Sequence, residues 1–129
     1  MFGEKYIMRD NTIYENELIK IEIEPSEIPW LKIFSQEPYK EFSDAPESVR
    51  VEIFRVLNII EKEMIKFFSP TKINIASFGN YVPHLHWHIM ARFENDSYFP
   101  EPMWGTKQRV GTYKLERFEE FLEGIIEKI

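Results

Sequence analysis

All three histidines of the chain lie in one run of seven residues, and their spacing is the strongest chemical signal in the sequence. The run reads His84, Leu85, His86, Trp87, His88, Ile89 and Met90. If it is a β-strand, successive side chains point to opposite faces, so the three imidazoles stand in a row on one face. We therefore expect this face to carry chemistry and the opposite, apolar face to pack against a core.

Three interpretations of this row are open. Alternate strand residues are about 6.6 Å apart, so two rings can reach one metal ion, whereas the outer pair starts about 13 Å apart. A metal site would thus need a carboxylate as well, since the chain has no cysteine and no further histidine. The three histidines could instead have no shared chemical task, although titratable groups this close repel each other when charged and so destabilise the fold. The favoured interpretation is a neutral imidazole nucleophile for phosphoryl-type chemistry, with His86 chosen because a histidine on each side can orient it.

The segment before the run can offer hydrogen-bond donors to a phosphate. Ser77 has a hydroxyl group, Asn80 has a carboxamide, and Gly79 exposes its backbone amide. A glycine also lets the backbone approach a ligand closely. An ordinary turn could have the same composition, but beside the histidines we predict a phosphate-binding segment.

The elements that must position these residues follow from hydrophobic periodicity. We expect strands at residues 18–24, 30–34 and 72–77, and a histidine strand from 84 to 92 or 93. An amphipathic helix of about six turns is expected to follow an N-cap at Asp44, and a second helix to run from near Thr112 to the C-terminus. The fold class predicted is α+β for one domain, residues 1–129, with an antiparallel sheet, helices on one face and the histidines on the other.

Charge and composition exclude some partners. A formal net charge of −6 argues against a sequence-independent nucleic-acid binder but allows a small phosphorylated ligand. Residues Met1–Tyr6 lack the long apolar region of a signal peptide, and no run approaches the ~20 apolar residues of a membrane span. We expect a cytoplasmic protein that binds neither nucleic acid nor membrane.

The run His84–Met90 resembles the histidine triad motif, H-φ-H-φ-H-φ-φ with φ apolar, at every position. Other stretches are similar to a bacterial, diadenosine polyphosphate hydrolase-like branch of the histidine triad (HIT) superfamily, namely residues 74–76, 79–80, 82–83 and 99–105. The likeness spans about Leu18 to Gly105. It implies a HIT-like fold, an antiparallel meander sheet with a long helix and a C-terminal helix, and a homodimer with a ten-stranded sheet.

The resemblance also implies a reaction. It is hydrolysis or nucleotidyl transfer at the α-phosphate of a nucleotide through a covalent nucleotidyl-histidine. The substrates would be dinucleoside polyphosphates or nucleoside phosphoramidates with a purine-type nucleotide, and no cofactor or metal would be needed. By motif position His86 is the nucleophile, and His84 and His88 hold the phosphate and orient the ring.

Four further residues take roles from the resemblance. Asn80 and Ser77 fall near the phosphate, and Glu22 falls near the acid that holds the ribose hydroxyls, although a solvated strand carboxylate would look the same. Many members carry a fourth histidine on the second strand, where the matching stretch of this chain reads Ile28, Pro29, Trp30 and Leu31. Trp30 could pack on the nucleotide or on the core. Without the usual leaving-group relay, two alternatives stay open: a nucleotide-binding module with little or no turnover, and a metal-dependent hydrolase.

Overall fold

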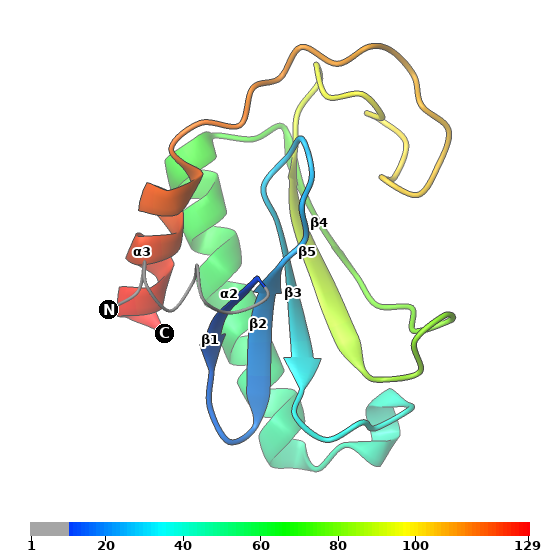
Figure 1. Cartoon of the computed structure of the whole chain (residues 1–129), viewed down its shortest axis with the longest axis vertical. Helices are drawn as coiled ribbons and strands as arrows, with labels where there is room; N and C mark the ends of the chain where they lie inside the picture. Colours follow the sequence, from blue (N-terminus) through cyan, green and yellow to red (C-terminus); the bar gives the residue numbers. More distant parts are fainter. Residues whose placement is uncertain (1–10) are drawn as a thin grey trace.

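The computed structural model describes residues 11–129. The sequence Arg9, Asp10, Asn11, Thr12 predicts a turn, and the start of this turn lies outside the described residues. Along the chain the elements are β1 (Thr12–Glu15), β2 (Ile19–Ile23), β3 (Trp30–Ser35), the 3-10 helix η1 (Phe42–Asp44), α2 (Glu47–Phe68), β4 (Lys72–Ala76), β5 (His86–Arg92) and α3 (Phe118–Lys128) (Figure 1). Strand β1 was not predicted, because its residues do not alternate strictly between apolar and polar side chains.

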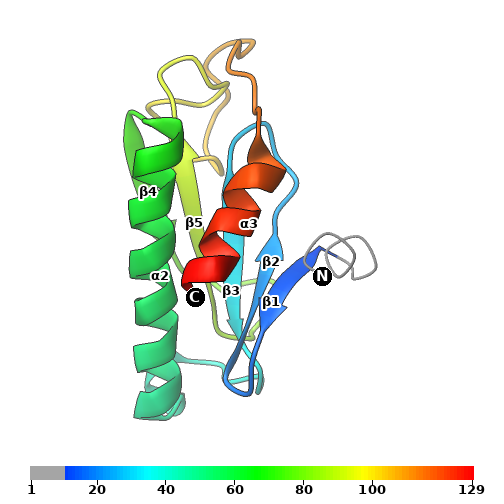
Figure 2. The ribbon, with the colours of Figure 1, turned by 90° about the vertical axis from the view of Figure 1, so that its left-hand side faces the viewer.

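The strands form one antiparallel sheet in the order β1-β2-β3-β5-β4. Both helices cover the same face, and in Figure 2 they lie in front of the sheet. The isoleucines of β2, Ile19, Ile21 and Ile23, are buried as expected. The predicted α+β class, with helices on one face only, is confirmed, and the other face of the sheet is left for a ligand.

Helix α2 packs a regular apolar stripe onto the sheet, as its periodicity predicted. The buried residues are Val49, Ile53, Val56, Leu57, Ile60 and Met64. The predicted N-cap at Asp44 is wrong, because the N-cap is Pro46. A proline disfavours helical dihedrals in the residue before it, and Ala45 is extended, with φ −79 and ψ 139. Asp44 instead accepts a hydrogen bond from the Glu41 amide across η1, at 3.0 Å.

The second helix begins at Phe118 rather than near Thr112, because backbone amides between these residues form hydrogen bonds outside the helix. The amides of Thr112 and Tyr113 donate to the carbonyl of Asn95, and the Tyr113 ring stacks on Phe93 at 3.8 Å between centroids. Residue 117, directly before the helix, has left-handed dihedrals, with φ 60. Helix α3 can therefore begin only after this turn.

Residues 94–117, all of which the structure describes, contain no helix or strand, and they run over one end of the sheet (Figure 1). A buried ion pair ties this segment down. Asp96 is fully buried and accepts hydrogen bonds from Arg92 Nε at 3.0 Å and Nη2 at 3.1 Å. It also accepts from the amides of Phe93, Tyr98 and Phe99. The start of the segment is thus fixed to the end of β5, the strand that carries the histidines.

Candidate functional site

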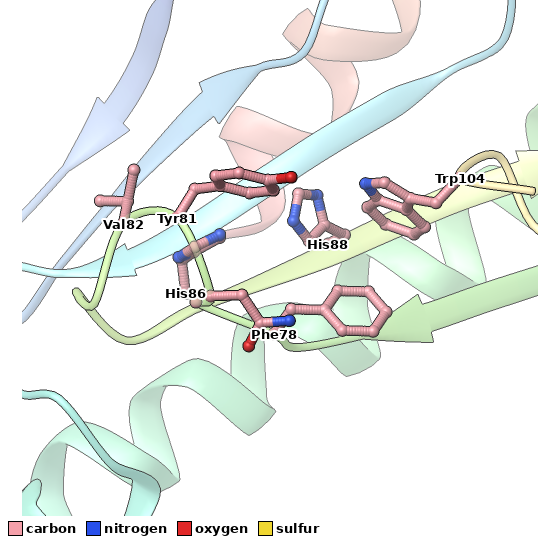
Figure 3. A pocket seen from close by; sticks show the side chains of 8 residues that line it. Phe78, Tyr81, Val82, His86, His88 and Trp104 are labelled. Atoms are coloured by element: carbon pink, nitrogen blue, oxygen red, sulfur yellow. The ribbon is translucent and has the colours of Figure 1, made fainter.

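A pocket of about 290 Å³ opens on the helix-free side of the sheet, at the start of β5. Its lining comes from β5, the loop before it and the 94–117 segment: Phe78, Gly79, Asn80, Tyr81, Val82, His86, His88 and Trp104. Figure 3 shows the two imidazoles side by side, with Tyr81 on one side and Trp104 beyond His88. The pocket therefore combines two titratable rings with mainly aromatic and aliphatic walls.

His86 is oriented by a backbone carbonyl. Its Nδ1 lies 2.7 Å from the carbonyl oxygen of His84. Since a carbonyl oxygen only accepts hydrogen bonds, Nδ1 carries the hydrogen and donates it. The ring also stacks on Phe34, at 4.7 Å between centroids and 22° between planes. In the neutral ring, Nε2 therefore keeps its lone pair, which is the requirement for a nucleophile.

His88 is held in the neutral state. It is only 8% exposed, and its Nδ1 accepts a hydrogen bond from Nε1 of Trp30 at 3.0 Å. Burial, followed by the charges of His86 and Lys32, lowers the pKa of His88 to about 4. At neutral pH the His88 ring is therefore uncharged and carries its hydrogen on Nε2.

His84 lies just before β5 and does not line the pocket, although its ring contacts Phe34, the residue on which His86 stacks. Strand β5 begins at His86, and the amide of Leu85 donates to the carbonyl of Tyr39 in another segment. The Nε2 of His84 lies 2.6 Å from the carbonyl oxygen of Ser35, to which it donates. The His84 ring thus fastens the loop to the end of β3, while its own carbonyl orients His86.

The residues expected around the phosphate are only partly brought together. Gly79 and Asn80 line the pocket, and Gly79 has φ +76, a conformation that favours glycine. The hydroxyl of Ser77 instead donates to the carbonyl of His86, at 2.6 Å. Ser77 does not line this pocket but an adjoining hollow, which shares Phe78, Gly79 and His86 with it.

Glu22 and Trp30 also lie outside the pocket lining. Glu22 forms an ion pair with Lys20 on the same strand, at 3.0 Å. Trp30 is buried and contacts His88 and Trp104 edge to face. The sequence did not single out the apolar lining residues Phe78, Tyr81, Val82 and Trp104. Val82 and Trp104 do lie in two of the stretches that carry the resemblance, residues 82–83 and 99–105, but no role was assigned to them there.

Residues 11–129 contain no group of three or more His, Cys, Asp or Glu side chains arranged to hold a metal ion. Over the same range, neither helix has the length and apolar character required to cross a bilayer. The polar groups that line the pocket are the imidazoles of His86 and His88, the carboxamide of Asn80 and the phenol of Tyr81.

Comparison with known proteins identifies the family. Residues 8–95 match the model of the HIT domain. A histidine triad protein from Bradyrhizobium japonicum is 27% identical, with a TM-score of 0.74 and coverage of 93% of this chain and 92% of that chain. One from Sinorhizobium meliloti is 26% identical, with a TM-score of 0.74 and coverage of 98% and 94%. A diadenosine triphosphate hydrolase from Plasmodium falciparum shares the fold, with 17% identity and a TM-score of 0.59. The match covers 89% of this chain and 71% of that chain. A search of curated proteins finds no match.

Proposed function

The chain belongs to the HIT domain family, and we propose that it is a nucleotide hydrolase or nucleotidyl transferase that acts at the α-phosphate through a covalent intermediate on His86. One observation carries this proposal: Nδ1 of His86 donates its hydrogen to the carbonyl oxygen of His84, 2.7 Å away, so Nε2 is the free, nucleophilic nitrogen. This nitrogen belongs to a ring that lines the pocket. A nucleophile fixed in this way needs no reorientation before it attacks.

The proposed reaction has two steps. In the first, the lone pair of His86 Nε2 forms a bond to the α-phosphorus, the bond from phosphorus to the leaving group breaks, and the leaving group departs with that electron pair. In the second, water or another acceptor attacks the phosphorus, the P–N bond breaks, and Nε2 regains its lone pair. Hydrolysis then releases a nucleoside monophosphate and the proton of the attacking water. The Nε2 hydrogen of His88 is the available donor for charge that develops on the phosphate.

We propose a nucleotide of the purine type as the ligand of this pocket. The backbone of Gly79 and the amide of Asn80 lie next to the imidazoles, in the place where a phosphate would be held. Phe78, Tyr81 and Trp104 give flat apolar surfaces on which an aromatic base can stack. Dinucleoside polyphosphates and nucleoside phosphoramidates are the substrate classes we propose, and the related Plasmodium falciparum protein is a diadenosine triphosphate hydrolase.

A substrate panel tests the proposal. Diadenosine tri- and tetraphosphate, adenosine phosphoramidate and their guanosine counterparts are incubated with the purified protein, and release of nucleoside monophosphate is followed by chromatography. We expect turnover of at least one compound, without added metal. Tight binding of mononucleotides in calorimetry while every compound stays intact would contradict the proposal and favour a nucleotide-binding module.

We further propose that two subunits pair through β4. This strand forms one edge of the sheet, and an edge strand presents backbone groups to a partner. The side chain of Ile75 in the middle of β4 is 43% exposed. Sedimentation should give about twice the chain mass of 15.6 kDa. Ile75→Lys should shift the protein to monomer, whereas Val110→Lys, at a position that is 84% exposed, should not. A wild-type monomer at high concentration would contradict the pairing.

A further inference from the structure

The buried side chain of Trp30 donates a hydrogen bond to His88, one of the two imidazoles that line the pocket. Trp30 lies at the start of β3, beside β5, and its Nε1 is 3.0 Å from Nδ1 of His88. Both side chains are 8% exposed. An indole nitrogen can only donate, so Nδ1 of His88 must accept. A proton on Nδ1 would place two N–H groups against each other and break this bond.

We infer that Trp30 is a positioning residue that holds His88 as a neutral donor with its hydrogen on Nε2. We further infer that the site thereby favours leaving groups that depart as anions, such as a phosphate chain, over amines. This inference rests on the proposed function and deepens it, because it names the class of bond that the site cleaves best. It assigns to Trp30 a role that acts through His88, since Trp30 does not itself line the pocket.

The charged groups around His88 agree with a neutral ring. On β5 its neighbour is His86, at 5.0 Å between ring centroids. On β3 the residue paired with it is Lys32, whose ammonium group binds Glu24 at 2.9 Å. On the pocket side the neighbours are the indole of Trp104, at 4.8 Å, and the phenol of Tyr81. The carboxylate of Glu24 is thus matched by Lys32, so no unpaired acid among these groups favours a second proton on His88.

The neutral state has a chemical consequence. When Nε2 of His86 attacks the α-phosphorus of an anhydride, the P–O bond breaks and the phosphate chain leaves with the electron pair, with no proton required. An amine leaving group must gain a proton on nitrogen as the P–N bond breaks. A neutral imidazole can donate a hydrogen bond to that nitrogen, but it is a very weak acid and does not supply the proton. Cleavage should therefore slow as the basicity of the leaving group increases.

Nitrogen-15 NMR of the histidine rings tests the hydrogen bond without any turnover. In the wild type, Nδ1 of His88 should be unprotonated, and the ring should not titrate between about pH 5.5 and pH 8, where an ordinary histidine does. Trp30→Phe keeps an aromatic ring but removes the donor. We expect it to mix the two tautomers and to raise the pKa of His88 by about one unit.

Trp87→Phe is the matched control for this variant. It makes the same chemical change on β5, on the opposite face of the sheet, and the buried Nε1 of Trp87 finds no hydrogen-bond partner among residues 11–129. The His88 signals should be the same in Trp87→Phe and in the wild type. If they are also unchanged in Trp30→Phe, the positioning role of Trp30 is overturned.

Kinetics test the consequence for the leaving group. A series of adenosine 5′-phosphate aryl esters of graded leaving-group pKa is compared with adenosine phosphoramidate. We expect kcat/KM to fall steadily as the pKa of the leaving group increases. The phosphoramidate should be cleaved at least about tenfold more slowly than an anhydride. Trp30→Phe should lower kcat about tenfold with little change in KM, the effect of one lost hydrogen bond. Equal rates for amine and phosphate leaving groups would overturn the proposed preference. No turnover of any compound would refute the proposed function, and the positioning role of Trp30 would then be decided by the NMR measurement alone.

Discussion

His86→Ala is expected to abolish the turnover of every substrate that the wild type cleaves, a loss of about 10⁴-fold or more. The reason is the covalent step: the variant lacks Nε2 of His86, and Nδ1 of the remaining pocket imidazole, His88, is already bound to Trp30. The remaining residues still line the cavity, so nucleotide binding should persist. The measurements are kcat with the best substrate of the panel and the Kd of a mononucleotide by calorimetry, which should stay within about threefold of the wild-type value.

His84→Ala is the informative comparison. It removes a ring that binds Ser35 but keeps the backbone carbonyl that orients His86. We expect a loss of about tenfold, typical of one hydrogen bond that positions a loop. The assignment of roles would be contradicted if His86→Ala kept more than a tenth of the wild-type rate, or if His84→Ala were the more damaging of the two variants.

Asp96→Ala should produce the largest loss of stability, about 3–5 kcal/mol in the free energy of unfolding. The substitution leaves the guanidinium group of Arg92, itself 1% exposed, buried without its carboxylate. It also removes the acceptor for the amides of Phe93, Tyr98 and Phe99. Urea unfolding followed by circular dichroism gives the free energy. Because the same segment brings Trp104 to the pocket, the substrate KM should increase as well.

The pH dependence of stability gives an independent check on this residue. Burial acts to raise the pKa of Asp96, but the hydrogen bonds from Arg92 and from the three amides outweigh it and hold the pKa below its usual value. A carboxyl group with a lowered pKa stabilises the fold above its unfolded pKa of about 4. This contribution is lost as the pH falls through the folded pKa. Wild-type stability should therefore decline below about pH 4, and Asp96→Asn should show a weaker decline.

An exposed ion pair serves as the control for Asp96. Glu120 binds Arg117 at 2.9 Å, and both side chains are at least 60% exposed. Glu120→Ala should leave the free energy of unfolding almost unchanged, because solvent screens such pairs. Equal losses for Asp96→Ala and Glu120→Ala would show that the buried network does not stabilise the fold in the way described.

Local patterns were sufficient to predict most of the architecture. The alternation of isoleucine with charged residues predicted β2, and the three- and four-residue steps between Val49 and Met64 predicted α2, because each pattern reflects one buried face. The two-faced character of β5 was predicted for the same reason, and from it the place of His86 and His88 on the helix-free side. These features depend on neighbours within a single element.

The parts that could not be predicted depend on contacts between distant segments. His84 lies outside the pocket lining, and its ring binds the carbonyl of Ser35, which lies 49 residues earlier. The bond between Trp30 and His88 joins residues 58 positions apart. Trp104 reaches the pocket from a long irregular segment and contacts Trp30, Phe78 and His88 there. Periodicity gives no information on such pairings, and so the sequence left Trp30 undecided between nucleotide and core.

The experiment that would best establish the chemistry is a mass measurement of the trapped intermediate. The protein is mixed with the best substrate of the panel, quenched in alkali to preserve a P–N bond, and measured intact and after digestion. We expect a mass increase of one nucleoside monophosphate less water, located on the peptide that contains His86 and absent from His86→Ala. An adduct on another residue, or rapid turnover without any adduct under conditions that preserve phosphohistidine, would contradict the nucleophilic role of His86.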